Sequence, residues 1–104
     1  MCITLLHVGG LVAVGFDPTA RYLLTVSHSG RGVFDTVSWN RVARDVSIAY
    51  PENGVVEGIG PIAGQRIKVR EIDYYRGTLT VTSPLGDYRL SYEEGTITVS
   101  STGT

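Results

Sequence analysis

Residues 11–35 read LVAVGFDPTARYLLTVSHSGRGVFD, and this stretch decides the fold class. Apolar residues alternate over 11–16 and 21–27, as expected for strands whose side chains point in turn to two faces. Residues 17–20 between them predict a turn in which proline fixes φ at the second position. Ser29-Gly30 then turns the chain back on itself. The stretch therefore predicts antiparallel strands joined by tight turns.

The residues before this stretch are also apolar. Residues 3–8 and 11–16 each alternate between two fairly apolar faces, and such strands are typical of the centre of a sheet. Gly9-Gly10 separates them, and paired glycines accept the positive φ angles of a two-residue hairpin turn. The sequence therefore predicts that these two segments are central strands joined as a hairpin.

The C-terminal half repeats the pattern. Residues 66–74 form a long predicted strand whose apolar phase changes, which predicts a bulge or a change of sheet edge near Arg70-Glu71. Shorter strands are predicted over 78–82, 88–92 and 96–100, with threonine-rich faces that are solvated or at an edge.

The composition agrees with this pattern. The 104 residues include 13 Gly, 4 Pro and 40 Val, Ile, Thr, Tyr, Phe and Trp, which favour turns and strands. Strong helix formers are few, and a chain this short buries one modest core. We expect a single all-β domain over residues 1–104, whose antiparallel hairpins form a small two-sheet sandwich or two blade-like four-stranded meanders.

Residues 12–42 resemble one blade of a WD-repeat β-propeller. The resemblance rests on Phe16-Asp17-Pro18, on RYLLT at 21–25, on Val33-Phe34-Asp35 and on Trp39. In that family the apolar-Asp pair ends the third strand of a four-stranded blade. Phe34 stands where the signature tryptophan belongs, and Ser29 where the turn aspartate belongs. A propeller needs at least four blades of about 40 residues, so the resemblance implies blade-like sheets that pack as a sandwich or several chains that assemble.

Charge and cysteine content narrow the function. Nine basic and ten acidic side chains give a net charge of −1, and the basic residues are spread along the chain, whereas nucleic-acid binders concentrate them. No stretch approaches the roughly 20 apolar residues that span a bilayer. Cys2 is the only cysteine, so a reducing cytoplasm fits best. We expect neither nucleic acid nor membrane as a partner.

Catalytic motifs are missing from the sequence. It has no Gly-x-Ser-x-Gly elbow, no His-Glu-x-x-His, no P-loop and no metal-ligand spacing. We therefore expect no enzyme activity, no cofactor and no metal site. The alternative hypothesis is a small-ligand-binding or hydrolytic protein that uses His28, near a hairpin tip, together with Asp35.

Residues 45–65 predict a long loop with several Gly and Pro residues, and loops of this length are often functional. Three interpretations are open: a partner-binding loop, a small-ligand loop, or a segment whose apolar residues tuck back over an open sheet edge. The apolar residues in question are Val55, Val56, Ile59 and Ile62.

The function that we expect is protein binding by a small cytosolic, bacterial module, antitoxin-like or immunity-like, that uses this loop and the adjacent strands. Aromatic and arginine side chains are enriched at interface hot spots, and the candidates are Trp39, Tyr50, Tyr74, Tyr75, Arg31 and Arg70. A third hypothesis is a structural subunit that assembles through strand edges. Residues 96–100 carry no charge or proline, so if this strand lies at a sheet edge it can pair with a second chain. This predicts a homodimer with a contact near Tyr88, Tyr92, Ile97 and Val99.

Overall fold

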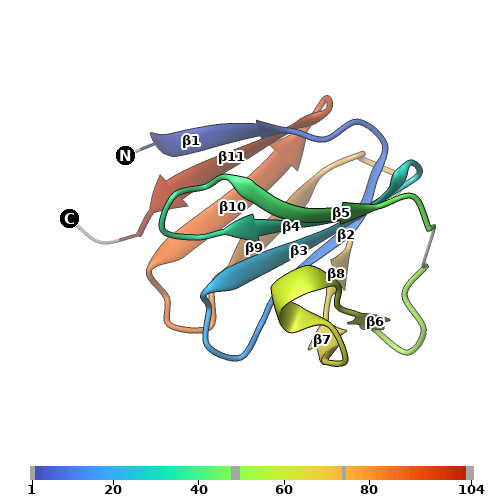
Figure 1. Ribbon diagram of the computed structural model, residues 1–104. Coiled ribbons are helices and arrows are strands. Elements are labelled where there is room, and N and C mark those ends of the chain that lie inside the picture. The colour runs from blue at the N-terminus through green and yellow to red at the C-terminus, as the bar shows by residue number, and fades with distance from the viewer. Residues whose placement is uncertain (1, 48–49, 74, 103–104) are drawn as a thin grey trace.

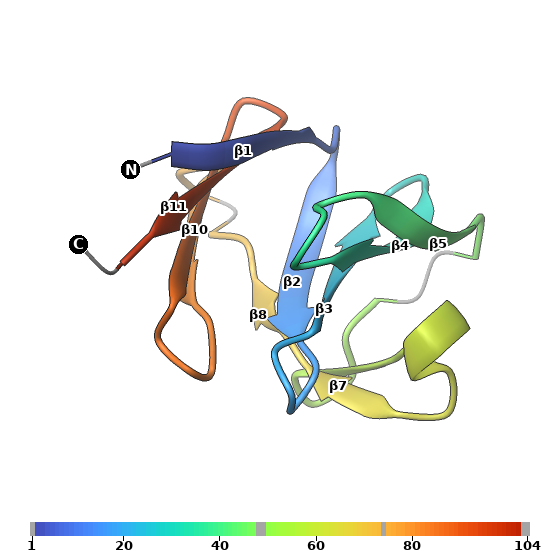
Figure 2. The ribbon, with the colours of Figure 1, turned by 60° about the vertical axis from the view of Figure 1, so that its left-hand side comes forward.

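The computed structural model describes residues 2–47, 50–73 and 75–102, and in these residues two antiparallel sheets pack face to face (Figure 1, Figure 2). The strands are β1 (Cys2–His7), β2 (Leu11–Phe16), β3 (Tyr22–Ser27), β4 (Gly30–Asp35), β5 (Arg41–Asp45), β6 (Val55–Glu57), β7 (Arg66–Lys68), β8 (Arg70–Glu71), β9 (Leu79–Thr82), β10 (Tyr88–Glu93) and β11 (Thr96–Ser101), with one 3₁₀ turn, η1 (Gly60–Ile62). The predicted all-β class and the two-sheet sandwich are confirmed.

Sheet A has the strand order β1-β11-β10-β9, and sheet B has the order β5-β4-β3-β2-β8. β6 and β7 form a separate two-stranded ribbon. The segment that resembles a WD-repeat blade supplies the meander from β2 to β5. In the described residues this meander is part of one sheet of a sandwich, extended by β8, and forms no propeller blade.

The main core lies between the two sheets. Leu11, Val14 and Phe16 of β2 pack there with Leu90 and Val99 of sheet A. The pairing of β2 with β3 shifts register between Leu11 and Ala13. Such a bulge lets Leu11 and Val14 point to the same side although they are three positions apart.

A second, smaller core covers the opposite face of sheet B. Val56 of β6, Ile62 of η1 and Ile67 of β7 are almost fully buried, and they pack with Leu24 and Val33. The predicted loop 45–65 therefore contains a strand and a 3₁₀ turn, and its apolar residues cover a sheet face rather than an open edge.

Close approach explains two glycines of this covering segment. A Cβ atom at Gly58 would overlap the carbonyl oxygen of Ile62, and one at Gly60 would overlap the Ala43 side chain on β5. Gly60 also has a φ of +58°, in the left-handed region that glycine tolerates. Glycine at these two positions therefore allows the segment to pass close to sheet B.

The predicted pairing of residues 3–8 with 11–16 is wrong. β1 pairs with β11 in sheet A, while β2 lies between β3 and β8 in sheet B, so Gly9-Gly10 crosses from one sheet to the other. Both edges of β2 are already occupied. β1 is an edge strand, not a central one, with Ile3 41% and Leu5 51% exposed.

Residues 96–100 do not meet the condition for the predicted dimer, a position at a sheet edge, because β11 has β1 on one side and β10 on the other. Tyr92, Ile97 and Val99 are buried in the inter-sheet core, and Tyr88 packs against it. These residues are not free to form the predicted dimer contact.

The predicted strand over 66–74 divides as its apolar phase indicated. β7 pairs with β6, and β8 then pairs with β2, so the chain changes partner next to Arg70-Glu71. The threonine-rich outer face is at least partly solvated, as predicted, at Thr80, Thr82, Thr96 and Thr98. In the described ranges, no helix is long and apolar enough to cross a membrane.

Candidate binding cleft

A cleft opens where the chain passes from sheet B to sheet A. β8 pairs with β2 and β9 pairs with β10, although β8 and β9 are consecutive strands. The Asp73 N–H donates to the Thr78 carbonyl at 2.9 Å at the base of the turn between them. Past this bond, no strand pairing joins β8 to β9 in the described part of the chain. The two arms of this hairpin diverge into different sheets (Figure 2).

The cleft has a volume of ≈ 800 Å³, which is within the range of ligand sites. One wall is the segment 66–71, which holds β7 and β8, and the other is the end of β9. Its apolar lining includes Phe16, Pro18, Val69, Val81 and Pro84. The cleft therefore offers apolar surface between two sheet edges.

A row of cations lies along one wall of this cleft. Arg66, Lys68 and Arg70 occupy alternate positions, and residues at this spacing share one face of an extended segment. The register pairs Arg70 with Val14, a residue of the inter-sheet core, so Arg70 lies on the face of sheet B that is turned toward sheet A. An apolar side chain would be expected at this position in a closed sandwich. All three cations are exposed at the cleft.

The three cations of this wall are in no ion pair within the described residues, although Glu57 is the cross-strand partner of Arg66 in the β6–β7 ribbon. The ion pairs in this part of the chain are Arg21 with Asp35 and Arg31 with Asp45, so none of the three cleft cations takes part in one. Glu71 is the one acidic residue among the lining residues. The cleft is therefore cationic on one side and apolar beneath.

Gly15 of β2 permits this arrangement. A Cβ atom at Gly15 would overlap the carbonyl oxygen of Lys68 and would lie 2.9 Å from Val69 Cγ1. The Val69 N–H in turn donates to the Gly54 carbonyl at 2.9 Å. The cation-bearing segment is thus held between β2 and the residue that precedes β6.

The predicted site residue Arg31 has a structural role. Its Nη2 lies 2.6 Å from Asp45 Oδ2, and its Nη1 donates to the Glu57 carbonyl at 2.9 Å. These bonds join β4, β5 and β6. The Arg31 hydrogen bond, aided by the Arg31 backbone N–H, holds the pKa of Asp45 below its ordinary value against the opposing effect of burial. Arg31 is therefore not a free contact for a partner.

His28 and Asp35, the polar residues of the alternative hypothesis, are not brought together. His28 lies in the turn before β4, and Asp35 ends β4. A strand of this length separates them by roughly 17 Å. His28 Nδ1 instead lies 3.3 Å from the hydroxyl oxygen of Tyr50. A site that needs both side chains cannot form here.

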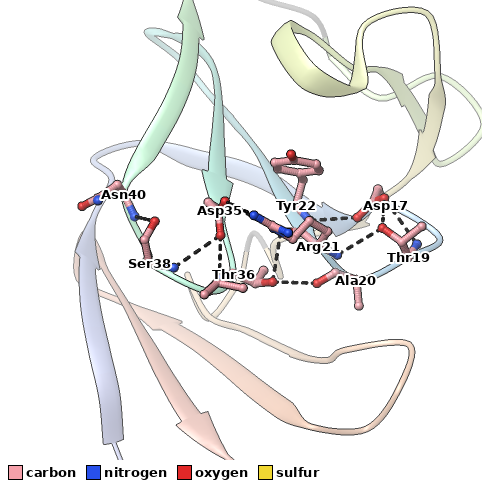
Figure 3. Close-up of polar contacts among 10 residues, drawn as sticks. Asp17, Thr19, Ala20, Arg21, Tyr22, Asp35, Thr36, Ser38 and Asn40 are labelled. Carbon is pink, nitrogen blue, oxygen red and sulfur yellow. Dashed lines mark hydrogen bonds and ion pairs between the residues drawn. The ribbon is translucent and has the colours of Figure 1, made fainter.

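Asp35 belongs to a polar network at one end of sheet B (Figure 3). Its carboxylate accepts from Arg21 at 3.0 Å and from the Val37 N–H at 2.7 Å, and these bonds lower its pKa. The Thr36 hydroxyl donates to the Ala20 carbonyl at 2.8 Å. The network ties the β2–β3 turn to the β4–β5 turn, which is a structural role.

The predicted aromatic candidates do not form one surface. Trp39 is partly buried and stacks edge-on against Tyr88, with ring centroids 5.5 Å apart. Tyr50 is 57% exposed beside His28, and Tyr75 is fully exposed in the turn after β8. Tyr74 lies outside the described residues. Of the six predicted contact residues, Arg70 lines the cleft.

A second, smaller hollow lies near the β3–β4 turn. Its volume is ≈ 160 Å³, which is below the size of ordinary ligand sites. The hydroxyls of Thr25 and Ser27 in its lining are hydrogen-bonded to the Gly32 and Gly30 carbonyls. Over the described ranges, no group of His, Cys, Asp and Glu side chains is placed to hold a metal ion.

Sequence reasoning missed most of the cleft. The sequence pattern predicts strands over 11–16, 66–74 and 78–82, and it indicates no binding role for Phe16, Arg66, Lys68 or Val81. The alternation of basic residues at 66, 68 and 70 was a visible signal for the cationic row. The opening between β8 and β9 had no such signal, because it depends on which sheet each strand joins.

Comparison with known proteins adds no relative from which a function could be transferred: no protein-family model, no curated protein and no solved structure matches this chain.

Proposed function

We propose that this protein is a non-catalytic, cytosolic binding module that holds an acidic segment of another protein in the cleft between its sheets. The observation that carries the proposal is the row of Arg66, Lys68 and Arg70, exposed and outside the ion pairs of the described residues, along an apolar cleft. Arginine pairs strongly with carboxylates because its fork geometry permits two hydrogen bonds.

The apolar lining favours a polypeptide over a simple anion. Phe16, Val81 and Pro84 contribute apolar surface to the cleft, and its burial under aliphatic side chains is favourable. A segment that carries both acidic and apolar residues on one face of an extended chain would satisfy both parts of the cleft. Capture of such a segment would also make it inaccessible, which is how an antitoxin-like or immunity-like inhibitor acts.

The experiment uses a fluorescein-labelled peptide of Glu-Glu-Val-Val repeats, which places glutamate and valine in turn on each face, with fluorescence anisotropy as the measurement. The test variant combines Arg66→Glu, Lys68→Glu and Arg70→Glu. The matched control combines Arg41→Glu, Arg44→Glu and Arg89→Glu, which changes the net charge equally at exposed arginines outside the cleft. We expect the test variant to weaken binding by about a hundredfold, as for loss of several charge-assisted contacts.

Two outcomes would overturn this proposal. One is equal binding by the test variant and the control, which would place the peptide elsewhere. The other is binding of a single-stranded oligonucleotide in preference to the glutamate-valine peptide, which would make a nucleic acid the natural occupant. A lysine-valine peptide of equal length serves as the probe of charge preference.

A further inference from the structure

Among the residues that the structure describes, the backbone of β9 has N–H and C=O groups without a partner on the side of the cleft. The Ser83 N–H donates to the Tyr88 carbonyl at 2.9 Å at the end of the β9–β10 pairing. In an antiparallel pair, residues alternate between those bonded to the partner strand and those directed away from it. Val81 therefore faces β10, and the N–H and C=O groups of Thr80 and Thr82 point away from it. The Thr78 carbonyl, in the same phase, accepts from Asp73 on that side.

The backbone of β8 faces this edge from the other side. The Ile72 N–H donates to the Val12 carbonyl at 2.9 Å, so Ile72 and Arg70 are directed toward β2. Glu71 is in the opposite phase, and its N–H and C=O point away from β2. Val69 is in the same phase as Glu71, and its N–H donates to the Gly54 carbonyl.

In a simple hairpin, the free backbone groups of β8 and β9 would bind each other. Continuing the Asp73–Thr78 register would pair Glu71 with Thr80 and Val69 with Thr82. This pairing is not formed past the turn, since β8 lies beside β2 in sheet B, β9 lies beside β10 in sheet A, and the two strands diverge. Two strand edges therefore flank the cleft, one above the other, with their free groups on the cleft side.

From this geometry, and resting on the proposed function, we propose that the partner segment binds as an added β-strand. It lies along β9, hydrogen-bonded to Thr80 and Thr82, between β9 and β8. On the face of the segment that is turned toward sheet B, carboxylates meet the cations of segment 66–71 and apolar side chains cover Phe16 and Val81. Addition of a strand to an open edge is a recurrent mode of peptide recognition, in which main-chain bonds supply affinity and pockets supply specificity.

The composition of β9 supports this edge as the docking site. Exposed edge strands are normally guarded by charged side chains, proline or bulges. Leu79–Thr82 has no charged residue, no proline and no register shift. The row of cations lies on the opposite wall of the cleft, and its positive charge favours binding of an acidic strand.

The test removes single N–H donors. Thr80→Pro deletes an N–H that points to the open edge, where proline is tolerated by a sheet. Leu5→Pro is the matched control, because the Val8 to Gly95 bond and the β1–β11 register direct the Leu5 N–H to the other open edge of the same sheet. Circular dichroism and urea unfolding establish that both variants fold. We expect Thr80→Pro to weaken binding of the glutamate-valine peptide about fivefold to tenfold, as for one lost hydrogen bond and a blocked edge, and Leu5→Pro to bind as wild type.

A second measurement does not depend on the proline variant. Amide hydrogen exchange by NMR on the wild-type protein follows the Thr80 and Thr82 N–H groups with and without the peptide. We expect both to become at least about tenfold slower, since they pass from solvent into a hydrogen bond. Peptide binding that needs the cations but leaves these amides unprotected, and survives Thr80→Pro, would overturn strand addition while leaving the proposed function standing. Peptide binding unaffected by the charge reversals would overturn the proposed function itself.

Discussion

Gly15 of β2 and Lys68 of β7 are in direct backbone contact: the Lys68 carbonyl oxygen occupies the space that a Cβ atom of residue 15 would take. This contact sets the position of the cationic wall against sheet B. It also explains how a charged segment can run across the edge of a strand that is otherwise fully buried.

Gly15→Ala should therefore move the segment 66–71 and weaken folding. Because the clash is with backbone rather than with a flexible side chain, we expect a loss of about 1–3 kcal/mol in the free energy of unfolding, as for overpacking in other cores. Urea unfolding measures it. Gly9→Ala is the control, since a Cβ atom there meets nothing within 4 Å. Equal stability of the two variants would show that the contact is not a constraint.

Asp45 should contribute to stability in a defined pH range. Arg31 holds the pKa of Asp45 below its ordinary value of 3.8, so the native state binds protons less readily than the unfolded chain. The contribution is complete well above 3.8 and is lost as the pH falls through the depressed native pKa. We expect Asp45→Asn to cost about 1 kcal/mol at neutral pH and little at low pH. Urea unfolding at a series of pH values measures this, with Asp87→Asn as the control. The same dependence of the free energy of unfolding on pH in both variants would contradict the prediction.

Asp17 should be more important for folding than its position in a turn suggests. It is 3% exposed, and its carboxylate accepts from the Tyr22 N–H at 2.8 Å and from the Thr19 hydroxyl at 2.5 Å. Asp17→Ala leaves these donors without a charged acceptor, and we expect a loss of about 2–3 kcal/mol. Thr19→Ala removes only the hydroxyl donor and should cost less. Thermal unfolding of the two variants compares their stabilities. A larger loss of stability in Thr19→Ala than in Asp17→Ala would contradict the prediction.

Trp39 and Tyr75 should differ in their effects on stability, although both were predicted interface residues. Trp39 packs on Tyr88 beside the inter-sheet core, so we expect Trp39→Ala to cost about 2 kcal/mol through lost apolar and aromatic contact. Tyr75 is fully exposed, and Tyr75→Ala should change stability by less than about 0.5 kcal/mol. Unfolding followed by circular dichroism compares them. If Trp39→Ala were as stable as the wild type, Trp39 would not be needed for folding and would again be a candidate for contact with a partner.

Local chemistry allowed the central part of the fold to be predicted. The Pro18 turn, the Gly30 turn and the alternation from Tyr22 to Val26 specify neighbouring strands, because each hairpin is closed by residues close in sequence. The phase change in 66–74 likewise marked the point where the chain changes partner.

Pairing between distant segments was not predictable by the same means. β1 has the apolar pattern of a central strand, yet its partner is β11 at the other end of the chain, and nothing local to Leu6 identifies Ile97 as its neighbour. The cleft also depends on a long-range pairing, since β8 joins β2 in sheet B while β9 joins β10 in sheet A, and the two strands diverge. The sequence alone shows the row of basic residues, but it does not show that a cleft lies beside them.

The pairing of the first strand with the last also orders events during synthesis. The meander from β2 to β5 can assemble as soon as Asp45 has left the ribosome, because its pairings are all between neighbours. Leu6 of β1, by contrast, stays uncovered until Ile97 emerges. A chain that ends before residue 96 would therefore leave its apolar N-terminal strand unpaired and the inner face of sheet B incompletely covered, and exposed apolar strands of this kind are sites of chaperone binding and aggregation.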